Sequence, residues 1–145
     1  MIERLFLAQL LPHVVCSPNY NLLQSAYRKL HSTDTALLKV MNDICEATDA
    51  GRSTQLVALD TSAAFDTIDH ATLLQRLNET FGISGDVLKW LASYLEQRSS
   101  FVKYGTGRSV TIPFDIGVPQ GSSLGPLLFT LFVAPLANVT SAHGI

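Results

Sequence analysis

The segment Leu56–His70 places an aspartate where a carboxylate could bind a metal ion. The apolar run Gln55–Leu59 is typical of a short buried strand, and Asp60 comes directly after it. Such a strand ends at the edge of a sheet, where open α/β sheets bind substrates. A carboxylate beside apolar residues needs a cation, a donor or water, and hard divalent metals prefer carboxylate oxygens. Asp60 therefore fits a metal site and an ordinary role equally well, whereas Asp69 is predicted to cap a helix and Asp66 to face water or cap a turn.

A second segment, Gly117–Pro126, surrounds a polar amide with glycines. Glycine lets the backbone approach a ligand closely, and a helix that starts after the segment has free N–H groups for an anion. Gln120 and Gly121 are therefore candidates for ligand binding. The same pattern also fits an ordinary loop between a strand and a helix, with Ser122 or Ser123 as the cap. The dinucleotide-binding spacing G-x-G-x-x-G is absent.

A third segment, Gln24–Thr33, contains two adjacent cations, Arg28 and Lys29. Both could bind phosphate, and arginine offers two parallel donors for it. A solvated surface pair is the ordinary alternative. The four histidines lack metal-ligand spacing and are predicted to be surface or capping residues. The sequence has no G-x-S-x-G element that would support a hydrolase triad.

Composition limits the function classes that remain. The chain has 145 residues, with ten Lys or Arg and twelve Asp or Glu, so its net charge is −2. This balance and a hydrophobic content of 47% exclude a disordered tail and a strongly basic nucleic-acid binder. The two cysteines are far apart and fit reduced thiols in an intracellular protein, nuclear or cytoplasmic and not secreted. The apolar run Leu127–Ala134 is shorter than the ~20 residues of a membrane span, so no membrane association is expected.

The elements that must position these segments are a mixture of helices and strands. Helices are predicted from Ser32 to about Gly51, from Asp69 to Gly82, after Ser84, and from about Leu124. A short strand is expected at 55–59, and a β-hairpin joins 101–104 to 110–114. This mixture predicts an α+β or α/β architecture in which helices cover a sheet.

In this order and with this spacing, the three segments resemble the reverse transcriptase domain of non-LTR retrotransposons, above all the LINE-type elements of animal genomes. Gln24–Leu38 is similar to the fingers motif Q-x-x-[FY]-R-x-x-x-S-T-x-x-A-L. Leu56–His70 is similar to D-x-S-x-A-F-D-x-[VI]-D-H, and Gly117–Phe129 to G-[VL]-P-Q-G-S-x-L-G-P-x-L-F. The resemblance extends from about His13 to Val139.

The resemblance implies an α+β fold, namely a partial right-hand polymerase with helices packed on a small, mainly antiparallel sheet. The chain would be one incomplete reverse transcriptase domain. About 1–52 would belong to the fingers and about 53–145 to the palm. The family reaction is RNA-directed DNA synthesis, so the implied partners are an RNA template, a DNA primer and a dNTP.

The resemblance also assigns roles to residues that contact the nucleotide. Phe65 matches the ring that lies beneath the incoming sugar and excludes a 2′-OH, which selects deoxynucleotides. Gln120 matches the amide that contacts the incoming nucleotide, in a loop where Gly121 admits the backbone to the base pair. Arg28 matches a fingers residue that meets the triphosphate.

Asp60 matches the aspartate that binds both catalytic Mg²⁺ ions, with the backbone carbonyl of Thr61 as a further ligand. The family usually has an apolar residue at the position of Thr61. The presence of threonine is expected to have a mild effect, because the backbone carbonyl and not the side chain would bind the metal. The family's aromatic-Ala-Asp-Asp motif, which supplies the other carboxylates, is expected beyond Ile145. One carboxylate cannot hold two Mg²⁺ close together, so the chain alone is expected to be inactive, as a truncated element copy or a gene-model fragment. Its uncovered apolar surface predicts self-association.

Two other function classes remain open at this point. A palm fragment without catalysis could still bind RNA or a protein partner. An aspartyl phosphotransferase resembling the haloacid dehalogenase group would use Asp60 as its nucleophile at the end of a strand. That group has a second aspartate two positions later, where this chain has Ser62, and a later acidic pair that is lacking here.

Overall fold

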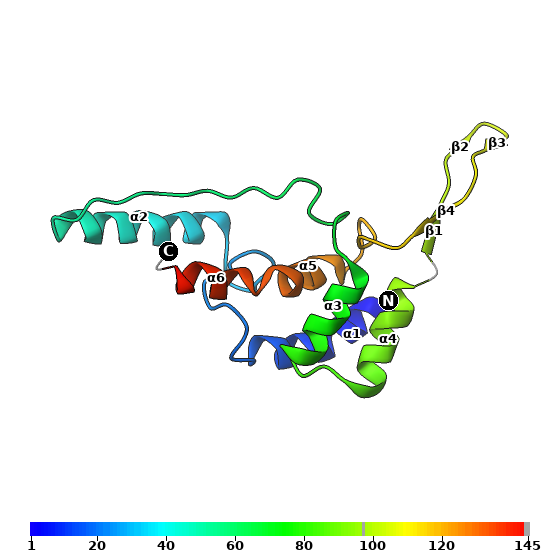
Figure 1. Ribbon diagram of the computed structural model, residues 1–145, viewed down its shortest axis with the longest axis horizontal. Helices are drawn as coiled ribbons and strands as arrows, with labels where there is room; N and C mark the ends of the chain where they lie inside the picture. Colours follow the sequence, from blue (N-terminus) through cyan, green and yellow to red (C-terminus); the bar gives the residue numbers. More distant parts are fainter. Residues whose placement is uncertain (97, 144–145) are drawn as a thin grey trace. The chain divides into compact units, whose positions relative to one another are not determined.

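The computed structural model describes residues 1–96 and 98–143. Along this part of the chain, four helices are followed by four short strands and then by two more helices (Figure 1). In order, the elements are α1 (Ile2–Val15), α2 (Thr33–Asp49), α3 (His70–Glu79), α4 (Gly85–Leu95), β1 (Arg98–Ser100), β2 (Lys103–Tyr104), β3 (Gly107–Arg108), β4 (Ile112–Phe114), α5 (Gly125–Val133) and α6 (Leu136–Ala142). The mixture of helices with antiparallel strand pairs is that of an α+β protein.

The chain forms two compact units. Unit 1 consists of Met1–Asn21 and Ala63–Ile145, and unit 2 consists of Leu22–Ser62. Unit 2 contains α2, and all the other elements belong to unit 1. The assignment of about 1–52 to fingers and about 53–145 to palm stays a prediction.

The predicted helix starts are confirmed where a polar side chain caps the first turn. Ser32 accepts a hydrogen bond from the backbone N–H of Thr35, whose hydroxyl accepts one from the N–H of Ser32, so α2 begins with a capping box. The carboxylate of Asp69 accepts from the N–H of Thr72 at 2.7 Å, and this hydrogen bond lowers the pKa of Asp69. Ser84 occupies the N-cap position of α4 but makes no side-chain cap bond.

Unit 1 is held together by helices that pack on one another. Its core is one cluster of apolar side chains from α1, α3, α4, α5 and the loops between them. The fully buried large side chains are Val14, Ile68, Leu73, Leu77, Leu91, Leu95, Leu124, Leu128 and Leu131. The expectation that helices pack on the sheet is wrong for the described residues, because no residue of β1–β4 is buried. Strands of two or three residues offer too little surface to form one side of a core.

The predicted β-hairpin is present, although its strands are shorter and interrupted. β1 pairs with β4 in antiparallel register, with Arg98 opposite Phe114 and Ser100 opposite Ile112. Further out, β2 pairs with β3, with Lys103 opposite Arg108. The hairpin extends away from the helices of unit 1 (Figure 1).

The predicted buried strand at 55–59 is wrong. Residues 52–61 form neither helix nor strand, and Leu59 is 73% exposed. Within the described chain, no strand pairs with this segment. An apolar run of this length needs neighbouring strands for its backbone hydrogen bonds, which the amino-acid pattern cannot reveal.

The N-terminal apolar run forms α1, and its Leu10 and Val14 lie in the core. By length and composition alone, the stretch Gly125–Ala142 could cross a membrane, with a mean hydropathy of 1.4 and 28% of it buried. Its helix α5 contributes Leu128 and Leu131 to the core of unit 1. The expectation of no membrane association stays a prediction.

Candidate functional site

Residues 63–70 of the first segment meet the loop of the second segment, Gly117–Pro126, in unit 1. The backbone N–H of Gly117 donates to the carbonyl of Ile68 at 2.7 Å, and that of Val118 donates to the carbonyl of Phe65 at 2.8 Å. The Nε2–H of His70 donates to the carbonyl of Gly117 at 2.7 Å. The segment before α3 and the loop before α5 are thus joined by hydrogen bonds across about 50 residues of sequence.

Gly117 is the residue that allows this close approach. Its φ of +84° lies in the left-handed region, which is strained for residues with a Cβ. A Cβ at this position would lie 3.0 Å from the Cα of Asp66 and 3.1 Å from the carbonyl oxygen of Phe65. A side chain would therefore push the two segments apart.

The joined segments carry three of the predicted nucleotide-binding residues, Phe65, Gln120 and Gly121. Phe65 is half-buried, and its ring packs against Phe129 of α5 with a centroid distance of 5.4 Å. Gln120 is exposed, and its amide lies 3.5 Å from a carboxylate oxygen of Asp66. Gly121 follows with a φ of +81° and open space around its Cβ position. An aromatic ring, an amide and a carboxylate therefore lie on adjoining segments.

A carboxylate from α1 reaches the same loop, a contact that the sequence analysis did not predict. Glu3 accepts a hydrogen bond from the backbone N–H of Ser123 at 2.7 Å and one from the Tyr94 hydroxyl at 3.2 Å. The hydroxyl of Ser122 accepts from the N–H of Gly125, the first residue of α5, at 2.9 Å, although the N-cap position itself is occupied by Leu124. The N–H groups that the sequence offers to an outside anion are thus partly used by the chain's own side chains.

Tyr94 connects this loop to the aromatic side chains of unit 1. Its ring stacks on Trp90 at 5.6 Å, and Trp90 in turn stacks on Phe6 of α1 at 4.1 Å. The Arg98 guanidinium lies 4.4 Å from the Tyr94 ring centroid. Burial raises the pKa of the Tyr94 hydroxyl, because removal from water disfavours the phenolate.

His70 was predicted to be a surface or capping residue, and this interpretation is wrong. Its imidazole is half-buried and bonds the loop before α5. His13 likewise donates from Nε2 to the carbonyl of Phe81 at 2.9 Å, so it links α1 to the end of α3. Both contacts join residues far apart in sequence, which spacing alone cannot reveal.

The remaining predicted site residues, Arg28, Asp60 and Thr61, belong to unit 2. Asp60 and Thr61 are exposed in the extended segment that precedes Ala63. A guanidinium nitrogen of Arg28 donates to the carbonyl of Leu22 at 2.6 Å. Because the predicted residues are divided between two units, their assembly into one site stays a prediction.

Backbone strain is concentrated in the segments that carry the sequence motifs. Tyr27 and Leu30, on either side of Arg28, have φ values of +58° and +64°, and Ala63 has +51°. A positive φ costs a residue with a Cβ roughly 1–3 kcal/mol. Such a conformation persists only where the surrounding structure requires it. Such strain is typical of functional segments.

Within the described residues, no group of three or more His, Cys, Asp or Glu side chains could hold a metal ion. Asp60 has one carboxylate, and a pair of Mg²⁺ ions needs several to offset their mutual repulsion. The described part of the chain therefore does not by itself fit a two-metal centre.

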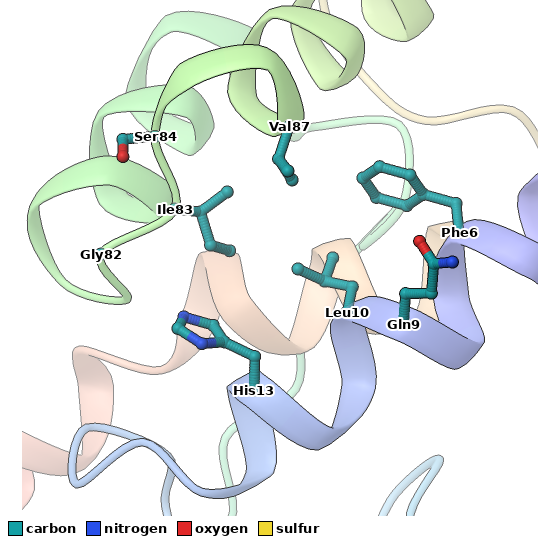
Figure 2. Close-up of a pocket in the computed structure, with 8 residues that line it drawn as sticks. All are labelled: Phe6, Gln9, Leu10, His13, Gly82, Ile83, Ser84 and Val87. Carbon is teal, nitrogen blue, oxygen red and sulfur yellow. The ribbon is translucent and has the colours of Figure 1, made fainter.

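A pocket of about 260 Å³ lies elsewhere in unit 1, between α1 and the connection from α3 to α4 (Figure 2). Side chains of Phe6, Leu10, Ile83 and Val87 point toward its centre (Figure 2). Its lining contains none of the predicted site residues, and the imidazole of His13 is already bonded to Phe81. The pocket is therefore separate from the candidate site.

Comparisons with known proteins identify the family. The sequence profile of "Reverse transcriptase (RNA-dependent DNA polymerase)" matches residues 1–143. The chain is 30% identical over 145 residues, its full length, to the RNA-directed DNA polymerase from mobile element jockey of Drosophila funebris. It is 34% identical over 109 residues, 75% of its length, to the probable RNA-directed DNA polymerase from transposon X-element of Drosophila melanogaster. The chain spans 16% and 12% of the length of these two relatives.

These matches confirm the resemblance seen in the three motifs, and they leave no support for the aspartyl phosphotransferase alternative. Reverse transcriptases are nucleotidyltransferases that generally depend on divalent metal ions. Since the profile covers nearly every residue described above, including both joined segments, the chain belongs to the reverse transcriptase family.

Proposed function

We propose that this chain forms the nucleotide-selecting part of an RNA-directed DNA polymerase that acts in the cell interior. It would comprise fingers residues and part of a palm, and the polymerase would extend a DNA primer with dNTPs on an RNA template. The observation that carries the proposal is the pairing of the Phe65–His70 segment with the Gly117–Gly121 loop. That pairing holds an aromatic ring and an exposed amide on adjoining segments of one unit.

In this proposal each nucleotide-facing residue has a distinct role. The ring of Phe65 excludes a sugar that carries a 2′-OH, because Phe129 behind it limits how far the ring can move. Gln120 donates to or accepts from the incoming nucleotide, and Gly121 lets the backbone come close to the base pair. Arg28 binds the triphosphate as a two-pronged donor.

Asp60 and the Thr61 carbonyl are proposed as metal ligands, which would need further carboxylates from outside the described residues. For the 145-residue chain alone, we therefore expect no dNTP incorporation on poly(rA)·oligo(dT). Incorporation that the Asp60→Ala variant abolishes would contradict this expectation.

The proposal is tested by nucleotide binding to the purified chain. Fluorescent dATP and fluorescent ATP are titrated separately, and we expect tighter binding of the deoxynucleotide. Gln120→Ala should weaken binding of both nucleotides by about 3- to 10-fold, the effect of one lost hydrogen bond. Phe65→Ala should instead reduce the preference for dATP over ATP.

Gln75→Ala is the matched control, since Gln75 is an exposed amide on α3 that bonds Glu79. It should leave both affinities unchanged. A folded chain that binds neither nucleotide, or one in which Gln75→Ala and Gln120→Ala act equally, would contradict the proposal.

A further inference from the structure

The β-hairpin formed by β1–β4 differs in charge from the rest of the chain. Residues 98–114 contain Arg98, Lys103 and Arg108 and no Asp or Glu. The other residues carry seven Lys or Arg and twelve Asp or Glu. The hairpin is therefore a local cationic element on an acidic protein, which net charge alone conceals.

Two of these cations lie directly opposite each other. Lys103 of β2 pairs in register with Arg108 of β3, so both side chains lie on the same face of the ladder. Like charges in this relationship destabilise a strand pair. An anion bound between them would remove the repulsion, so the pair is suited to a phosphate group.

Aromatic rings accompany the two cations and stay exposed. The Arg108 guanidinium lies 3.6 Å from the ring centroid of Phe101, which places this ring beside the cationic pair. Tyr104 is 90% exposed and lies opposite Gly107, which has no side chain to cover the ring. The core cluster of unit 1 contains no residue of the hairpin, so neither ring serves to hold the helices together.

Exposed cations interleaved with exposed rings fit a single strand of nucleic acid. Such a strand offers phosphates to the cations and unstacked bases to the rings, and every base has a face that can stack. A folded protein partner would have to supply its own acidic side chains to neutralise Lys103 and Arg108. A duplex keeps its bases stacked inside and cannot use Tyr104 in this way.

We propose that the end of the hairpin, with Phe101, Lys103 and Arg108 on one face and Tyr104 on the other, binds single-stranded nucleic acid. Lys103 and Arg108 hold adjacent phosphates, and the rings stack on bases. The inference rests on the proposed function only in naming nucleic acid as the polyanion. RNA and DNA share the chemistry involved, so either strand could be bound.

Arg98 has a different role in the same hairpin. Its Nε donates to the carbonyl of Tyr94 at 2.6 Å, and its guanidinium lies over the Tyr94 ring. These contacts anchor the base of the hairpin to α4. Arg98 is therefore left unchanged in the experiment.

The experiment measures binding of labelled oligo(U) and oligo(dT) to the full chain by fluorescence anisotropy over a range of salt concentrations. No nucleotide and no metal are added, so the outcome is independent of catalysis. In the double variant Lys103→Gln/Arg108→Gln, two phosphate contacts are lost. We expect weaker binding and a salt dependence of log K that is shallower by about 1.4, since each phosphate contributes about 0.7 on a single strand.

The matched control is the double variant Lys39→Gln/Lys89→Gln. It changes the net charge equally, and both lysines are exposed and form ion pairs on helices outside the hairpin. It should retain the wild-type salt dependence. Equal losses in the two double variants would show a general charge effect and overturn the proposal.

Variants of the rings separate nucleic acid from other polyanions. Tyr104→Ala should weaken oligonucleotide binding about tenfold, as expected for one lost base stack, and leave binding of a heparin fragment unchanged. Circular dichroism and Trp90 fluorescence should show an intact fold, because the hairpin lies outside the core. Oligonucleotide binding that is insensitive to Tyr104→Ala and Phe101→Leu would overturn the proposal. Tighter binding of oligo(U) or of oligo(dT) would support the proposal and would show whether the hairpin binds RNA or DNA.

Loss of hairpin binding and loss of the proposed function are distinguishable. The fluorescent-nucleotide titration depends on Phe65 and Gln120, and no residue of the hairpin takes part in it. A chain that binds nucleotide but no oligonucleotide would overturn the inference and leave the proposed function standing.

Discussion

The carboxylate of Glu3 accepts a hydrogen bond from the backbone N–H of Ser123, 120 residues later in the sequence, at 2.7 Å. The same carboxylate accepts from the hydroxyl of Tyr94. One side chain of α1 thus holds both α4 and the loop that carries Gln120. Helix α1 is therefore a structural support of the candidate site, although it contains none of the sequence motifs.

Glu3→Ala should destabilise unit 1 by about 1–3 kcal/mol. The substitution leaves the N–H of Ser123 and the hydroxyl of Tyr94 without their partly buried acceptor. Urea unfolding followed by the fluorescence of Trp90, the single tryptophan, measures the loss. Glu79→Ala, which removes an exposed carboxylate from α3, should change stability by less than about 0.5 kcal/mol. If both variants lose the same free energy of unfolding, Glu3 does not support the candidate site.

Gly117→Ala should cost more stability than Gly121→Ala. Both glycines have a φ above +80°, so each alanine carries a strain of roughly 1–2 kcal/mol. Only at position 117 would the new Cβ meet backbone, 3.0 Å from the Cα of Asp66. The difference between the two variants, measured by urea unfolding, reports the contact between the joined segments. A difference near zero would mean that the segments separate without cost.

Which features could be predicted from sequence depended on how far apart the interacting residues lie. The caps of α2 and α3 were predictable, because Ser32 and Asp69 bond N–H groups three residues away. The bond between Glu3 and Ser123 was not, since no local pattern links those positions. The prediction of a strand at 55–59 was wrong for a related reason. An apolar run shows a local preference for extended backbone, but it does not show whether a partner strand is present. The pairing of the two motif segments was expected only through the family resemblance.

Tyr94 should make unit 1 sensitive to alkaline pH. Burial raises its pKa above the ordinary value of 10.0, so the folded state holds the phenolic proton more tightly than the unfolded state. The stabilisation is fully present below about pH 10 and is lost as the pH rises through the folded-state pKa.

The measurement compares urea unfolding of the wild type with that of Tyr94→Phe between about pH 8 and 11. The variant should be less stable at pH 8, because it lacks the bond to Glu3, and should lose less stability above pH 10. Tyr104→Phe, at an exposed position, should follow the wild type throughout. If Tyr94→Phe and the wild type lose stability in parallel, burial of the hydroxyl has no part in the pH dependence.

The purified chain should self-associate through α2. No residue of this helix is buried, and Leu37, Leu38 and Met41 are exposed. Exposed apolar stripes of this kind mark association surfaces, so oligomers should increase with concentration in size-exclusion chromatography with light scattering. Leu37→Gln/Met41→Gln, one helical turn apart, should shift the chain toward monomer. Asn42→Gln/Glu46→Gln has the same spacing on a polar stripe of α2 and should leave association unchanged. A monomer at all concentrations, with one cooperative thermal transition, would contradict this prediction, because the apolar stripe would then need no second copy to cover it.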